Sequence, residues 1–449
     1  MDSTVTRLAA ATPDTRDRYI DLLRVASLGT VVLGHWLMAA VATGAGGRVE
    51  VGNLLAVVPE LQLLTWALQI MPVFFFVGGF AHAQSYRSLC RRTGSDRVYA
   101  AFLRARLQRL LRPTIAFVLV WGALALGLQL LGAGGGLLDV TLRLVTQPLW
   151  FIGIYLAMVA FTPPLLRAHE RWGWAAFAAL VAAAGTVDLL RFALGVPYVE
   201  FLNFAFVWLA VHQLGFLRAD GRLRVRGVPA ALAGCGLAGA VALVTYGPYP
   251  LSMVGMPGEK ISNMAPPTFA LLCHGLWLVG AVELVRGPVG AWLRRPRVWR
   301  GVIAASGVAM TAFLWHLTAM LGVYGALLAL DVPLPRPASA QWWAQAPLRV
   351  GAAVLVTALL VAAFRRFERP VSASVVVGSG PLAAVGITFC LFGVLGLSMV
   401  GFGGLLEGRT ATLIAVEVSA PVAVGMVLGG WALVAGGCFL PHPAPSRKS

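Results

Sequence analysis

The chain has 449 residues, of which 59% are hydrophobic and only 12% charged, with a mean hydropathy of +0.80. These values exclude a soluble globular protein, in which about 25% of residues are charged. A formal net charge of +17 would suggest nucleic-acid binding in a soluble protein. Here the basic residues follow the expected membrane topology, so no nucleic-acid partner is expected.

Apolar segments long enough to span a bilayer, about 20 residues each, recur along the chain. Their uniform apolarity excludes a transmembrane barrel, whose strands would alternate over about ten residues. The sequence therefore predicts an all-α polytopic membrane helical bundle of about twelve transmembrane helices. The expected spans are 22–44, 61–83, 114–132, 149–166, 174–190, 201–217, 228–247, 267–285, 302–328, 348–364, 381–402 and 413–438.

Basic residues are distributed unevenly between the two sides of this expected bundle. With the N-terminus in the cytoplasm, only seven of the 35 basic residues fall on the outer side. Because cytoplasmic loops carry the excess of basic residues, both termini are predicted to be cytoplasmic in the cell membrane. Lys260 and Lys448 are the only lysines, a bias typical of a GC-rich bacterial genome.

Four parts are expected along the chain: a disordered cytoplasmic lead (1–18), a membrane core (19–371), two accessory transmembrane helices (372–439) and a short cytoplasmic tail (440–449). The lead and the tail are polar and contain proline, which favours disorder. In the last helix, Gly425 and Gly429 predict a packing face of small residues.

The first helix carries charged and titratable residues at depth. His35 follows Arg24 by eleven residues, which at 100° per residue places both on one face, about 16 Å apart along the axis. Asp21 and Ser27 flank this face at about 60°. A buried arginine costs about 2.5–3.5 kcal/mol or more at the centre of a membrane helix. This polar stripe therefore indicates a functional site.

His316, in the ninth span, is the histidine most able to meet His35. Each lies roughly 13 or 14 residues into its span, near the middle of the bilayer or somewhat beyond it. Imidazole titrates near pH 6.5, so it can accept a proton from a hydroxyl and return it at cellular pH. His212 and His274 are better explained as packing residues. No histidine or cysteine spacing supports a metal site, and none is expected.

The loop at 85–112 is unusually rich in arginine. Its arginines next to Pro113 lie among leucines, three of them at helical spacing, which predicts an amphipathic helix that ends at the proline. They are Arg104, Arg106, Arg109 and Arg112. Two functions are open for this helix: contact with anionic membrane lipids, or binding of a polyanion such as the phosphates of coenzyme A.

Six segments resemble, in order, those of the membrane acyltransferase family 3. Arg24-x10-His35 looks like the first-helix signature, and Met71–Phe80 resembles a Phe-Phe segment in which many members have Ser-Gly instead of Gly78-Gly79. The arginines before Pro113 resemble the basic loop of the family. Pro148–Tyr155 with Trp150, Phe313–His316 and Phe367–Pro370 with Glu368 are similar to three further motifs, and Asn203, Gln213–Gly215 and Asn263–Pro267 look like the actinobacterial-type branch.

The resemblance implies a ten-helix core over 19–371 that is an integral membrane O-acyltransferase. Such an enzyme moves an acyl group, often acetyl, from acyl-CoA to a hydroxyl of a sugar, glycolipid or cell-envelope acceptor. Acyl-CoA is then a co-substrate, and no permanently bound cofactor is implied.

The resemblance also implies the functions of single residues. His35, Arg24 and Asp21 would be catalytic, with His35 either as general base or as acyl carrier and Arg24 on a phosphate or the thioester oxygen. Glu368 would be a supporting residue, and its simplest interpretation is a salt bridge to a loop arginine. Residues implied in substrate or acyl-CoA binding are Arg104, Arg106, Arg109, Arg112, Trp150 and His316.

Two other functions can be compared with acyl transfer. A proton-coupled transporter or flippase of an anionic lipid or metabolite would use His35, His316 and Arg24 at the midplane of the membrane. Transporters often contain repeated halves, and no repeat is found in this sequence. A non-catalytic scaffold predicts no polar stripe at depth. O-acyl transfer is therefore the preferred hypothesis.

Overall fold

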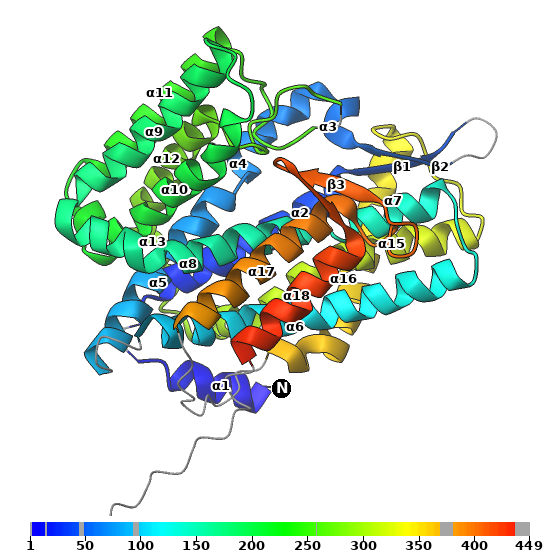
Figure 1. Cartoon of the computed structure of the whole chain (residues 1–449), viewed down its shortest axis with the longest axis horizontal. Coiled ribbons are helices and arrows are strands. Elements are labelled where there is room, and N and C mark those ends of the chain that lie inside the picture. Colours follow the sequence, from blue (N-terminus) through cyan, green and yellow to red (C-terminus); the bar gives the residue numbers. More distant parts are fainter. Residues whose placement is uncertain are drawn as a thin grey trace, which may run out of the picture. The chain divides into compact units, whose positions relative to one another are not determined.

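The structure is a computed structural model that describes residues 2–13, 16–44, 49–92, 98–256, 258–368 and 380–435 (Figure 1). The chain forms two compact units, Met1–Gln84 with Pro164–Glu368, and Ser85–Pro163 with Arg369–Ser449. Helices make up most of both units. The unit boundaries pass through two helices, α5 (Met71–Arg92) and α8 (Pro148–Trp172).

The first unit holds most of the helices. Before α5 it contains α1 (Asp2–Ala10), α2 (Arg18–Met38), β1 (Ala39–Thr43), β2 (Val49–Asn53), α3 (Leu54–Val57), η2 (Pro59–Leu63) and α4 (Leu64–Leu68). After α8 it contains α9 (Trp174–Phe192), η4 (Val199–Leu202), α10 (Asn203–Ala219), η5 (Arg222–Arg224), α11 (Val228–Tyr246), α12 (Phe269–Leu284), α13 (Arg286–Trp292), α14 (Pro296–Ser306), α15 (Ala309–Ala329), α16 (Ala340–Phe364) and η6 (Arg365–Glu368).

The second unit contains α6 (Val98–Leu130), α7 (Gly136–Leu144), α17 (Gly380–Val400), β3 (Thr410–Leu413), β4 (Val416–Ser419) and α18 (Ala420–Ala435). The helices α17 and α18, orange and red in Figure 1, pack along each other and on α6. A Cβ atom on Gly393 would come within 2.8 Å of the backbone of Ala423 and Val427, so small residues do mediate this contact. Within the described residues, however, no atom of another element comes within 4 Å of a Cβ placed on Gly425 or Gly429, so these two glycines do not form the predicted packing face.

The predicted helical bundle is confirmed, and each of the twelve expected spans corresponds to a helix. Among the described residues, ten helices are long and apolar enough to cross a membrane. Of the other two, α12 qualifies only together with α13, from which it is separated by a bend of 52°, and α18 is shorter. The chain is therefore a multi-pass membrane protein.

The first span ends earlier than expected. The helix α2 stops at Met38, and the chain continues into an antiparallel pair of strands, in which Ala39 pairs with Asn53. Val41 of β1 belongs to a buried cluster with Leu317 and Met320 of α15. Packing against α15 thus fixes an extended conformation where apolarity alone predicts helix to residue 44.

Two further predictions differ from the structure. The helix α6 continues through Pro113, where an end was predicted, and the hydroxyl of Thr114 donates to the carbonyl of Leu110 at 2.9 Å. Proline is tolerated inside membrane helices, although Pro113 lacks the N–H that would bond the carbonyl of Arg109. The lead expected to be disordered contains α1, which packs on α14, and Trp299 Nε1 donates to Thr12 Oγ1 at 3.0 Å.

Candidate active site

The start of α2 is fixed by Asp17, which has two functions. One carboxylate oxygen accepts from the backbone N–H groups of Tyr19 and Ile20 at 3.2 and 3.3 Å and so caps the helix. The other accepts from Arg218 of α10 at 2.7 Å. The Tyr19 hydroxyl donates to the carbonyl of Val282 on α12. The polar stripe therefore begins on a helix that is anchored to two others.

Asp21 is buried and joins two guanidinium groups. It accepts from Arg16 Nε at 2.6 Å and from Arg24 Nη2 at 3.0 Å. The hydrogen bond from Arg16 to Asp21 raises the pKa of that arginine. In this geometry Asp21 holds the guanidinium group of Arg24 by an ion pair.

Near the other end of α2, His35 lies against His316 of α15. The distance from His35 Nδ1 to His316 Nε2 is 2.7 Å, and the two rings stack with centroids 5.0 Å apart and planes 6° from parallel. Trp36 Nε1 donates to the carbonyl of His316 at 3.0 Å. Two residues that are 281 positions apart thus form a histidine pair inside the first unit.

The hydrogen bonds of this histidine pair determine its neutral tautomers. His316 Nδ1 faces the carbonyl oxygen of Phe313, which can only accept, so Nδ1 carries the hydrogen. His316 Nε2 is then an acceptor, and His35 Nδ1 must be the donor to it. The lone pair of His35 consequently lies on Nε2. The arrangement leaves one basic nitrogen on His35 for chemistry.

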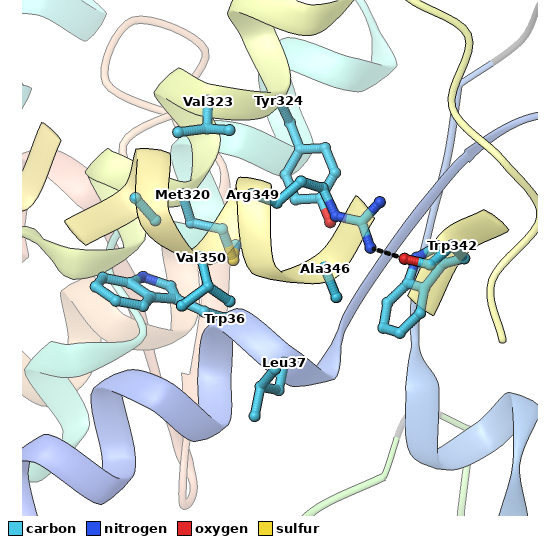
Figure 2. Close-up of a pocket in the computed structure, with 10 residues that line it drawn as sticks. Trp36, Leu37, Met320, Val323, Tyr324, Trp342, Ala346, Arg349 and Val350 are labelled. Atoms are coloured by element: carbon cyan, nitrogen blue, oxygen red, sulfur yellow. Dashed lines mark hydrogen bonds between the residues drawn. The ribbon is translucent and has the colours of Figure 1, made fainter. Parts of the chain in front are cut away.

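A narrow pocket lies beside this pair, between α2, α15 and α16 (Figure 2). Its wall combines aromatic rings, aliphatic side chains and one arginine. The lining residues are Trp36, Leu37, Met320, Val323, Tyr324, Trp342, Ala346, Arg349, Val350 and Ala353. Trp36, which lines this pocket, follows His35 in the chain and donates to the carbonyl of His316.

A second pocket opens at the start of α2 and is strongly basic. Its lining residues are Arg16, Asp17, Arg18, Tyr19, Arg218, Arg224, Arg286, Gly290 and Leu293. Arg218, which is 2% exposed, is held by Asp17 and by Glu283 at 2.9 Å. Five arginines and a single carboxylate around one pocket favour a polyanionic ligand.

A second histidine pair lies where α5 crosses α10. His82 Nδ1 and His212 Nε2 are 3.0 Å apart, and both residues are fully buried. Gly79 and Gly215 allow this close crossing, since a Cβ on Gly79 would clash with the carbonyl of His212. His212 was expected to pack, and its packing against a second histidine is not evident from the sequence.

Glu368 stabilises the helix that carries His316. Its carboxylate accepts from the backbone N–H groups of Met310 and Thr311 at 3.1 and 2.9 Å, and from the Thr311 hydroxyl at 2.6 Å. These are free donors at the N-terminus of α15, where a negative charge is favourable. Within the described part of the chain, Glu368 thus contacts a helix end instead of the expected loop arginine. Arg369 and Pro370, which complete its motif, lie outside the described residues.

The other predicted binding residues belong to the second unit. The expected arginines of α6 are half-buried except for the exposed Arg109, and Trp150 of α8 is half-buried against the ring of Phe151. They are Arg104, Arg106, Arg109 and Arg112. The first unit, by contrast, brings together Asp21 with Arg24, and His35 with His316.

Two groups of arginines that line the pockets were not among the site residues predicted from the sequence. Arg218, Arg224 and Arg286 are scattered along the sequence among many other arginines, and only the fold places them around one pocket. Arg349 did carry a signal, because it is a charged residue at the start of an apolar segment on the side expected to be poor in arginine.

Comparison with known proteins places these features in one family. Residues 17–365 match the model of the acyltransferase 3 family, which is described as an acyltransferase domain. No curated protein and no solved structure matches the chain. The matched range includes the polar stripe of α2, the basic helix α6 and His316.

Proposed function

The chain belongs to the membrane acyltransferase family 3 and is an acyltransferase, and on this premise we propose that it transfers an acetyl or similar acyl group from acyl-CoA to a hydroxyl group. The acceptor is a sugar, a glycolipid or another molecule of the cell envelope. Membership of an enzyme family argues against the transporter and the scaffold considered above.

The observation that carries this proposal is the histidine pair with its basic His35 Nε2. In the proposed step, His35 Nε2 takes the proton of the acceptor hydroxyl while the oxygen attacks the thioester carbonyl. The tetrahedral intermediate then collapses, the carbon–sulfur bond breaks, and the imidazolium returns the proton to the leaving thiolate. Arg24, held by Asp21, binds the donor in this proposal. His316 holds the tautomer of His35, as an orienting group does for other catalytic histidines.

The donor end of the site is the basic pocket at the start of α2. Tyr19 lines that pocket and Trp36 lines the pocket beside the histidine pair, so one helix spans both, about 26 Å apart. We propose that the phosphates of coenzyme A bind the basic pocket and that the thioester extends along α2 toward His35. The buried hydroxyl of Ser27, which has no partner among the described residues, lies on this route.

The test is turnover of radiolabelled acetyl-CoA by the purified protein in lipid nanodiscs. His35→Ala is expected to lower turnover by about 10²- to 10⁴-fold, the usual contribution of a general base. His442→Ala, in the polar tail, is the matched control and is expected to keep full turnover. Undiminished turnover in a folded His35→Ala protein would rule out the catalytic function of His35.

A further inference from the structure

Arg349 is a buried cation that forms no ion pair with a carboxylate of the described residues. It is 9% exposed and donates to the carbonyl of Trp342 at 2.9 Å and to Gln345 Oε1 at 3.5 Å. Its guanidinium also lies over the Trp342 ring, 4.7 Å from the centroid. Within the ranges that the structure describes, no acidic side chain forms an ion pair with it. Figure 2 shows the guanidinium between Tyr324 and Trp342.

Arg218 is a second buried arginine, and its charge is compensated. Arg218 is paired with two carboxylates, those of Asp17 and Glu283. A buried charge without an opposite charge is strongly unfavourable, especially inside a membrane segment. Arg349 therefore lacks the compensation that Arg218 has, and an anionic ligand would supply it.

Trp342 provides a second unsatisfied donor in the same pocket. It is 1% exposed, and its indole N–H has no hydrogen-bond partner in the described residues. A buried indole N–H usually finds an acceptor. Arg349 and Trp342 together offer one charged and one neutral donor to a ligand in the pocket beside the histidine pair.

We propose that this pocket binds an anionic acceptor, namely a hydroxyl-bearing carbohydrate that carries a carboxylate or phosphate group. The anionic group pairs with Arg349, and because the pocket is too narrow to enclose a sugar ring, the body of the sugar lies outside it. Trp36 lines this pocket, follows His35 in the chain and bonds to His316, so an acceptor held by Arg349 lies next to the residues that carry the histidine pair. This inference rests on the proposed acyl transfer and specifies its acceptor.

The experiment compares three probes as acceptors of radiolabelled acetyl from acetyl-CoA: methyl β-D-glucopyranoside, methyl β-D-glucuronide and glucose 6-phosphate. The readout is the ratio of kcat/KM for each charged sugar to that for the neutral one, which does not depend on the amount of active protein. We expect a ratio of at least about tenfold in the natural protein, since a charge-assisted contact contributes about 1.5–3 kcal/mol. In Arg349→Gln the ratio should fall to about one, and Arg349→Lys should keep part of it.

Arg336→Gln is the matched control, because Arg336 is exposed in the segment that precedes α16 and does not line the pocket. It should keep the ratio of the natural protein. A ratio near one in the natural protein, or an unchanged ratio in Arg349→Gln, overturns the proposal. Loss of the preference when phosphatidylglycerol is added to phosphatidylcholine nanodiscs would mean that a lipid headgroup occupies the pocket, which also overturns it.

Binding of the three sugars, measured by isothermal titration, separates this inference from the proposed function. Charge-selective binding that is lost in Arg349→Gln, in a protein that turns over no acetyl-CoA, supports anion recognition and contradicts acyl transfer. Acetyl-CoA turnover together with charge-independent binding supports acyl transfer and overturns anion recognition.

Discussion

Two contacts of α15 position His316, one within the helix and one at its N-terminus. Phe313 fixes the hydrogen on Nδ1, and the helix N-terminus held by Glu368 fixes the start of the helix. At the scale of single residues, the reactivity of His35 thus depends on a backbone carbonyl three positions before its partner. This dependence can be tested by changing the partner and keeping His35.

His316→Leu is expected to lower kcat by about 10- to 100-fold, because His35 loses the acceptor that holds its Nδ1–H. His316→Gln should recover part of this loss, since an amide oxygen can accept the same hydrogen bond. The measurement is kcat at saturating acetyl-CoA, with a thermal unfolding curve for each variant. Equal kcat in the two variants would contradict an orienting function.

The arginines of the basic pocket and those of α6 are two candidate binding sites for the phosphates of coenzyme A, and the KM for acetyl-CoA distinguishes them. Arg224→Gln in the basic pocket should raise the KM for acetyl-CoA several-fold, and the effect should shrink at high salt because the contact is electrostatic. Arg109→Gln on α6 is the parallel variant, since the sequence predicts α6 as the phosphate-binding element. A larger increase in KM for Arg109→Gln would assign the phosphates of coenzyme A to α6.

At the scale of elements, close contacts between helices explain several small residues. Gly79 of α5 and Gly215 of α10 bring the two helix backbones into contact, next to the pair of His82 and His212. This crossing leaves no volume for an added methyl group, since the opposing atoms belong to the backbone and cannot rotate away. Many family members have Ser-Gly where this chain has Gly78-Gly79, so the departure is at Gly78, whereas Gly79, which makes the close contact, is the glycine that both share.

Gly79→Ala is therefore expected to destabilise the protein by about 1–3 kcal/mol, the usual cost of overpacking. Gly234→Ala in α11 is the control, because nothing lies within 4 Å of a Cβ at that position and alanine favours helix. Thermal unfolding in detergent, followed by the loss of monodisperse protein, measures both. Equal midpoints for the two variants would mean that the crossing of α5 and α10 can open without cost.

The helices could be predicted from the sequence because apolar length depends on the chain alone. Their ends and their rotations could not, as Gly425, Pro113 and Ala39 show in different ways. Gly425 is a small residue of the kind expected at a helix contact, but no described atom of another element comes within 4 Å of a Cβ placed on it. The helix α6 continues past a proline. The strand β1 is extended because α15 lies beside it. Each of these outcomes depends on a neighbour that is distant in sequence.

The same limit applies to the candidate site. His35 and His316 could be paired in advance because both lie at a similar depth, a property that can be read by counting residues. The unpaired charge of Arg349 and the pocket around Arg218 depend on which side chains converge, and this follows only from the fold.

At the scale of the whole molecule, the uneven distribution of basic residues predicts how the chain lies in the membrane. Both termini and the basic pocket should face the cytoplasm, where coenzyme A is found, and the hairpin of β1 and β2 should face the opposite side. Green fluorescent protein fused to the C-terminus should fluoresce, and alkaline phosphatase fused after Arg336 should be active. Phosphatase activity at the C-terminus would invert this topology.

Two neighbouring residues of α2 contact His316, and their hydrogen bonds depend on each other. Trp36 donates a hydrogen bond to the backbone carbonyl of His316, and the adjacent His35 bonds to the His316 ring. Two consecutive residues of α2 thus contact both the backbone and the side chain of one residue on α15. A slide of one helix along the other by a single residue, about 1.5 Å, would break both contacts together. The two contacts therefore form and break together, so a tilt of α2 relative to α15 is expected to change the fraction of molecules in which the histidine pair is formed.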